Sequence, residues 1–131
     1  GSPVGARRTY VYLGGEPLLE ANVIEAIREG RAYLSTGAVL DPAINGARPG
    51  ATIRGGKLTA TTSLQSDEPV DRVDLVVNGK VVDSANLKGA KSGHITLTGA
   101  ADSGWAVIQV LAKDNPTPLA LTNAVYLRAP R

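Results

Sequence analysis

The sequence contains no cysteine and no methionine, and it has a single histidine and a single tryptophan. Without cysteine there can be no disulfide, no thiolate metal site and no cysteine nucleophile, and the redox compartment stays open. One histidine alone supplies too few ligands for a histidine metal site. Because a natural reading frame starts with methionine, we expect a fragment or a processed product, and whether Gly1 and Ser2 are native residues stays open.

Long apolar runs and strong charge of one sign are also missing. No stretch approaches the roughly 20 apolar residues that cross a bilayer, and the first residues do not read as a signal peptide. Fourteen basic and twelve acidic residues leave a net charge of +2, and the longest basic run is Arg7-Arg8. The sequence therefore indicates neither a membrane nor a nucleic-acid partner. It leaves localisation open, although an extracytoplasmic setting is compatible with the absence of cysteine.

The composition is that of a folded chain. The 131 residues are 43% hydrophobic and 20% charged, which is close to the average for soluble globular proteins. A chain of this length buries roughly two thirds of its unfolded surface. We therefore expect one domain, or one domain with an appendage, around a real hydrophobic core.

The N-terminal part predicts a strand followed by a helix. Arg7 to Leu13 is rich in β-branched and aromatic residues and stops at Gly14-Gly15, as a strand does. Pro17 suits a first helical turn, apolar residues then recur at helical spacing (Leu19, Val23, Ile24, Ile27), and Gly30 suits the helix end. This helix is too short to be stable alone, so its apolar face must pack on something.

From Ala32 onward the apolar residues alternate and turn residues recur at the spacing of a β-sandwich or barrel. Asn78-Gly79 is the strongest turn, because apolar alternation flanks it and a two-residue hairpin needs positive φ at both positions. A second turn is expected at Ser66 to Pro69, and the helix-to-strand change places a boundary at Gly37. The predicted strands are Ala32 to Ser35, Val39 to Ile44, Leu58 to Gln65, Arg72 to Val77, Lys80 to Ser84, His94 to Thr98, Ala106 to Ala112 and Leu121 to Leu127.

His94 is the first candidate for chemistry. A metal ligand or general base needs partners, and the serines (Ser92, Ser103) and acids (Asp83, Asp102) stand at no diagnostic spacing. We therefore interpret His94 as a half-exposed residue at a strand end. No catalytic, cofactor-binding or metal-binding residue is assigned.

Trp105 has two interpretations. It begins an alternating strand that is largely apolar on both faces, which favours a central strand and a tryptophan in or at the edge of the core. The alternative is a platform on which a sugar ring stacks. That role needs neighbouring exposed aromatic residues, and the candidates are Tyr10, Tyr12, Tyr33 and Tyr126.

Three further groups are weaker candidates. The acidic loop pairs Asp67-Glu68 and Asp114-Asn115 would supply oxygen ligands to calcium at one end of a sandwich, but solvated turns are the commoner explanation. Gly14-Gly15 and Gly55-Gly56 have no lysine and no strand-to-helix context, so they do not predict a phosphate loop. Arg7-Arg8 is more simply a solvated or edge-protecting strand end.

Several segments, in order, resemble one known family. Glu25 to Gly37, then Ile44-Asn45-Gly46 and Pro49-Gly50, resemble the region after the catalytic barrel in carbaryl-hydrolase-type metallohydrolases of the PHP (polymerase and histidinol phosphatase) superfamily. Ala38 and Ala124 depart from it, since that family commonly has proline there. The other matching segments are Pro3-Val4-Gly5 and Arg8 to Val11, near the family's last metal-binding motif, and Val73 to Lys80, Gly104 to Val107 and Thr122 to Tyr126, in its C-terminal sandwich.

The resemblance implies a fold and a role. It implies a mainly β chain: residues 1–37 form a strand-helix-strand appendage, the tail of a PHP catalytic domain, and residues 38–131 form an immunoglobulin-like antiparallel β-sandwich. The chain would be a non-catalytic C-terminal region that supports the barrel of a metal-dependent hydrolase or shapes access to its active site. Its partner would be the upstream catalytic domain, and its N-terminal strand and helix face could also pair two copies of the chain.

Two other roles stay open. One is an immunoglobulin-like module that binds a carbohydrate or a protein through its loops. The other is an inert structural domain of a secreted or surface protein. In all three roles the chain itself is not an enzyme and holds no cofactor.

Overall fold

The computed structural model describes residues 8–11, 32–35 and 37–129. The predicted helix from Pro17 to Gly30 therefore lies outside the described residues. The two strands predicted on either side of it are present as β1 (Arg8–Val11) and β2 (Ala32–Ser35), and they pair antiparallel. No helix among these residues has the length and apolar character of a membrane span.

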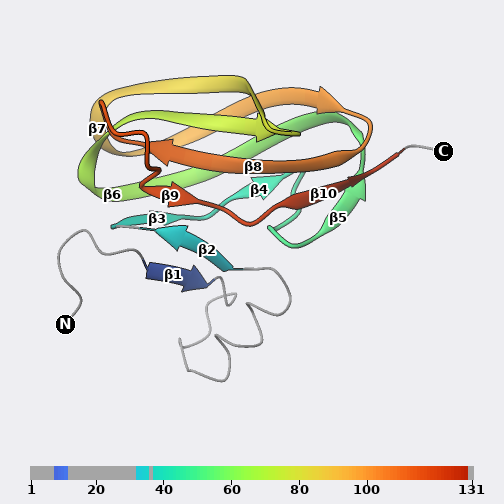
Figure 1. Ribbon diagram of the computed structural model, residues 1–131, viewed down its shortest axis with the longest axis horizontal. Coiled ribbons are helices and arrows are strands. Elements are labelled where there is room, and N and C mark those ends of the chain that lie inside the picture. Colours follow the sequence, from blue (N-terminus) through green and yellow to red (C-terminus); the bar gives the residue numbers. More distant parts are fainter. Residues whose placement is uncertain (1–7, 12–31, 36, 130–131) are drawn as a thin grey trace.

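The described part of the chain is mainly β and sandwich-like, with two layers (Figure 1). In the first layer, β3 (Ala38–Leu40) and β4 (Ala43–Ile44) pair with the first half of β6 (Gly56–Val77), which pairs on its other side with the last part of β7 (Lys80–Ala101). In the second layer the order is the first part of β7, the second half of β6, β8 (Gly104–Leu111), β10 (Val125–Arg128) and β5 (Thr52–Arg54). The short strand β9 (Ala120–Leu121) pairs with both β8 and β2, so it joins the N-terminal strands to the second layer.

The hairpin of β6 and β7 runs through both layers. The turn expected at Ser66 to Pro69 is wrong, because β6 continues through it and shifts register between Gln65 and Val70 and again before Arg72. Proline cannot donate to the ladder, and a bulge bends the strand while keeping it paired on either side. The separate strands expected at Lys80 to Ser84 and His94 to Thr98 are likewise one strand, β7.

Three other expectations are corrected. The strand predicted from Val39 to Ile44 is divided into β3 and β4, because Pro42 has no N–H to donate to β6, although the Asp41 N–H still donates to the Ser63 carbonyl at 3.3 Å. The strand predicted from Leu121 to Leu127 is divided into β9 and β10. Strand β5 was not predicted, and it pairs in parallel with β10, so the sandwich is not wholly antiparallel. Three residues are too few to show an alternating pattern.

One hydrophobic cluster fills the space between the layers. It takes the inward residues of β6 and β7 in the first layer (Leu58, Ala60, Leu64, Ile95, Leu97) and those of β6, β8 and β10 in the second (Val73, Leu75, Val77, Ile108, Val110, Val125, Leu127). The predicted hairpin at Asn78-Gly79 is confirmed, with φ of 52° and 85°. Because alternate residues of each strand fill this core, the residues between them form the two outer faces.

Candidate binding face

His94 lies on the outer face of the first layer, exposed and within β7 rather than at a strand end. It stands opposite Ser63 in an open groove of about 480 Å³, which Ser92 and Asp41 also line. No hydrogen bond joins the His94 side chain to any other residue that the structure describes, and the Asp41 carboxylate is paired with Arg48. A nucleophile, a base and an acid thus lie near one another without the contacts that would activate a serine.

Two of the residues weighed beside His94, Asp83 and Ser103, are engaged in structural hydrogen bonds, Ser103 through its backbone carbonyl. Asp83 accepts hydrogen bonds from the backbone N–H groups of Thr98 and Ser84, and the Ser103 carbonyl accepts one from Asn78. Among residues 8–11, 32–35 and 37–129 no group of three or more histidine, cysteine or acidic residues is placed to hold a metal ion. The two acidic loop pairs lie apart: Asp67 lies beside Gly37, and Asp114 lines a different groove with Asp71 and Arg72. The structure therefore does not bring them together as ligands of one calcium ion.

The second layer holds a buried carboxylate on its outer face. Asp74 of β6 is 0% exposed. It accepts hydrogen bonds from Ser84 Oγ at 2.6 Å, Gln109 Nε2 at 2.8 Å and Arg72 Nε at 3.2 Å. Because Ser84 is opposite Asp74 on β7 and Gln109 is opposite it on β8, this one side chain ties three strands together.

The hydrogen bonds decide the charge of Asp74. Burial alone raises the pKa of its carboxyl group, but the bonds from Ser84, Gln109 and Arg72, together with the positive charge of Arg72, lower it, and the net pKa lies below its ordinary value. Asp74 is therefore ionised near neutral pH. Both carboxylate oxygens of Asp74 already accept hydrogen bonds from Ser84, Gln109 and Arg72. The role of Asp74 is therefore to hold the layer together, not to bind a ligand.

Trp105 and Tyr126 form a pair on the same outer face. They are opposite each other on β8 and β10 and are 38% and 51% exposed, so Trp105 is not buried in the core, and of the expected positions only the core edge remains. The Tyr126 N–H donates to the Ala51 carbonyl at 2.8 Å, and the Trp105 N–H donates to Asn78 Oδ1 at 3.0 Å. The backbones of Trp105 and Tyr126 therefore do not bond to each other, which makes this a non-hydrogen-bonded pair. In antiparallel sheets, the side chains of such pairs lie closer together than those of hydrogen-bonded pairs.

The other three tyrosines belong to the N-terminal segment of the chain. Tyr10 and Tyr33 are opposite each other on β1 and β2, and Tyr12 lies outside the description. The expected central position of the Trp105 strand is confirmed, because β8 pairs with β6, β9 and β10.

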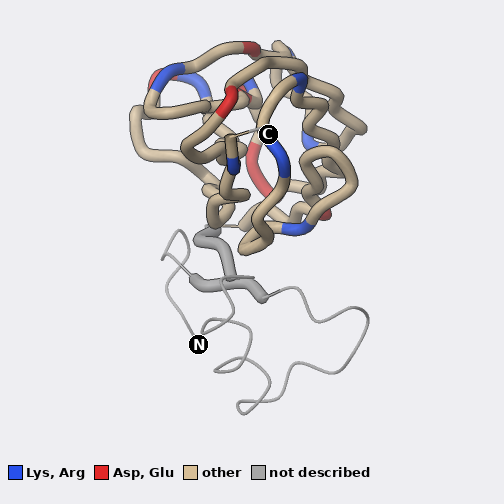
Figure 2. Tube along the Cα trace, turned by 90° about the vertical axis from the view of Figure 1, so that its right-hand side faces the viewer, with Lys and Arg blue, Asp and Glu red and all other residues tan. Residues whose placement is uncertain are grey.

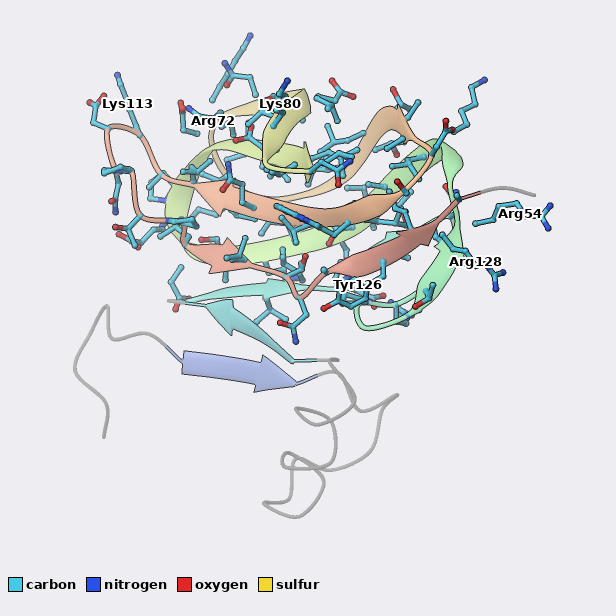
Figure 3. The ribbon with its side chains drawn as sticks, turned by 45° about the vertical axis from the view of Figure 1, so that its right-hand side comes forward. Arg54, Arg72, Lys80, Lys113, Tyr126 and Arg128 are labelled. Carbon is cyan, nitrogen blue, oxygen red and sulfur yellow. The ribbon has the colours of Figure 1, made fainter. Side chains whose placement is uncertain are left out.

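Two arginines extend the face. Arg128 of β10 is opposite Arg54 of β5, just as Tyr126 is opposite Thr52, and all four are exposed. Figure 3 shows Arg54 and Arg128 at the same end of their strands, with Tyr126 nearer the start of β10. Neither arginine forms an ion pair with any described residue. We call Trp105, Tyr126, Arg54, Arg128 and Thr52 the aromatic face.

The sequence contains only part of this signal. The alternation of Trp105, Val107 and Gln109 indicated that one face of β8 begins with a tryptophan. It did not indicate which face of the strand packs on the core. The parallel partner β5 was missed, and with it the pairing of Arg54 with Arg128. A residue pattern of the form Tyr-x-Arg at 126–128 beside Thr-x-Arg at 52–54 is the one local hint that existed.

Known proteins provide no further guide to this site. Comparison of the chain with models of protein families, with curated proteins and with solved structures finds no match in any of the three.

Proposed function

We propose that the chain is the non-catalytic C-terminal region of a PHP-type metal-dependent hydrolase, with an immunoglobulin-like sandwich. The observation that supports this proposal is the pairing of β2 with β9, which joins the segment before the sandwich to its second layer. The resembling segments run through both parts in the same order. The layer order, with β6 and β7 each contributing to both layers, also agrees with an immunoglobulin-like arrangement.

The parent protein tests this proposal. We expect the reading frame upstream of Gly1 to encode a metal-binding Ser-Asp-x-His type motif and earlier paired histidines. The full-length protein should then contain a stoichiometric divalent metal and hydrolyse an ester or carbamate, whereas the 131-residue chain should do neither. An upstream frame without those histidines would refute the assignment.

A second function, carbohydrate binding, is favoured by one observation: Trp105 and Tyr126 are neighbours and both exposed. The C–H face of a sugar ring packs on the face of an aromatic ring, and exposed aromatic neighbours are what a stacking platform needs. The two functions are compatible, because a non-catalytic region can hold the substrate of the domain it accompanies.

Glycan arrays test the second function. The purified chain should retain one class of glycan, and Trp105→Ala should abolish that retention. The matched control is Val39→Ala, which removes an exposed apolar side chain (52% exposed) from the other outer face. Equal loss in both variants would show general apolar adsorption instead of a stacking site.

A further inference from the structure

Arg54 and Arg128 are the feature that the proposed functions leave unexplained. Their positions are directly opposite in the parallel pair of β10 and β5. Like charges directly opposite each other on a sheet are unfavourable. No described acidic residue offsets them: the nearby Asp102, whose backbone carbonyl lies beside Gly55, forms no ion pair with either arginine.

We propose that the aromatic face binds acidic carbohydrate: Trp105 and Tyr126 stack on sugar rings, and Arg54 and Arg128 bind a carboxylate of the same chain. This inference rests on the second proposed function and adds the ligand's charge. A guanidinium group presents a planar fork of N–H donors that matches the two oxygens of a carboxylate. A carboxylate between the two arginines would also relieve their repulsion.

The shape of the face favours an extended sugar chain over a compact ligand. Small molecules are usually bound in concave pockets that bury most of their surface. The largest grooves described lie elsewhere, by His94 and by Asp71 and Asp114, whereas the aromatic face consists of alternating residues on three neighbouring strands. A polymer lying along the sheet can contact an aromatic pair and, two residues farther along β10, the arginine pair.

Two other polymers fit less well. Single-stranded nucleic acid also stacks on aromatic rings, but it needs a positively charged track along its backbone. Figure 2 shows basic and acidic residues interspersed over the sandwich, and the net charge is only +2. A protein partner commonly needs about 800 Å² on each side and roughly 20 to 30 residues, more than this group of five residues provides.

Binding of defined oligosaccharides tests the inference. Isothermal titration of the intact chain should detect an oligogalacturonate and no neutral galacto-oligosaccharide of the same length. The double variant Arg54→Gln, Arg128→Gln should weaken oligogalacturonate binding at least tenfold. The matched control is Lys88→Gln, Lys113→Gln, because these two lysines line one groove and their removal changes the net charge equally; it should change affinity less than twofold.

The other outcomes distinguish a failure of the acidic ligand from a failure of carbohydrate binding itself. Equal binding of the neutral and acidic sugars would refute the acidic ligand and leave carbohydrate binding intact. No binding of either sugar would overturn the acidic-ligand inference, and carbohydrate binding itself is refuted only if the glycan array also shows no retention. Heparin and single-stranded DNA could bind as tightly as the oligogalacturonate, and the arginine and lysine double variants could weaken that binding equally. This result would show non-specific attraction of polyanions and overturn the inference. Since Trp105→Ala also changes a strand end, Tyr126→Ala is the second stacking variant, and each variant is checked for an unchanged circular dichroism spectrum.

Discussion

The two layers of the sandwich each contain one Asn-Gly turn with the same hydrogen bonds. Asn45-Gly46 and Asn78-Gly79 have nearly equal φ values of 50° and 78°, and 52° and 85°. Asn45 Nδ2 donates to the Lys57 carbonyl and its Oδ1 accepts from the Thr59 N–H. In the other layer Asn78 Nδ2 donates to the Ser103 carbonyl and its Oδ1 accepts from the Trp105 N–H.

The residue between the two contacts differs. In the first layer it is Leu58, a buried core residue. In the second it is Gly104, at φ 110°, where an added Cβ would lie 1.8 Å from Asn78 Oδ1. The same side-chain bridge therefore anchors a core strand in one layer and an exposed tryptophan in the other. The layers also differ in their arginine–aspartate pairs, since Asp41 is exposed and Asp74 is buried.

The largest effect should come from Gly104→Ala. The new methyl group collides with Asn78 and the backbone is in a left-handed region that alanine resists, so we expect a loss of about 3 kcal/mol in the free energy of unfolding. Chemical denaturation followed by circular dichroism measures it. The control, Gly79→Ala, has positive φ but open space around its Cβ and should cost about 1 kcal/mol. Equal losses would mean that the contact with Asn78 is unimportant.

The two aspartates should differ next. Asp74→Asn weakens hydrogen bonds to a buried charge and leaves Arg72 without its partner, so we expect a loss of roughly 2 to 3 kcal/mol. Asp41→Asn breaks an exposed pair with Arg48 and should cost less than about 1 kcal/mol. The free energies of unfolding in urea decide this, and similar values for the two variants would contradict a special role for the Asp74 network.

Replacing either turn asparagine should cost the same free energy of unfolding, but each replacement should disturb a different layer. Asn45→Ala and Asn78→Ala each remove two side-chain hydrogen bonds and a residue that tolerates positive φ, so each should lose about 2 kcal/mol. Because Trp105 is the only tryptophan, its fluorescence reports on one layer alone. We expect a shifted emission maximum in folded Asn78→Ala and an unchanged one in Asn45→Ala; a shift in both would show that the layers are not independent.

The sequence predicted the parts of the fold that local rules decide. Alternation identified most strands, and Asn78-Gly79 identified the hairpin, because those signals depend on neighbouring residues. The continuity of β6 through Pro69 was not predictable, because pairing with β7 on both sides of the bulge outweighs the local turn preference. The aromatic face was half predicted: Tyr126 was named as a candidate neighbour of Trp105, but which of the tyrosines reaches it depends on pairing between distant strands.

The smallest predicted effect is a pH dependence that separates Asp74 from every other carboxylate. The folded-state pKa of Asp74 lies below its ordinary value of 3.8, so its ionised form contributes stability that is present above that value and is lost as the pH falls through the folded-state pKa. Unfolding free energies of the wild type and Asp74→Asn should therefore differ most above the ordinary pKa of an aspartate, and the difference should shrink as the pH falls through the lowered folded-state pKa of Asp74 and its carboxyl group is protonated. All other acidic groups are common to the two proteins and cancel in the difference. A difference that stays constant down to low pH would mean that the Asp74 network acts through shape and packing rather than through the charge of its carboxylate.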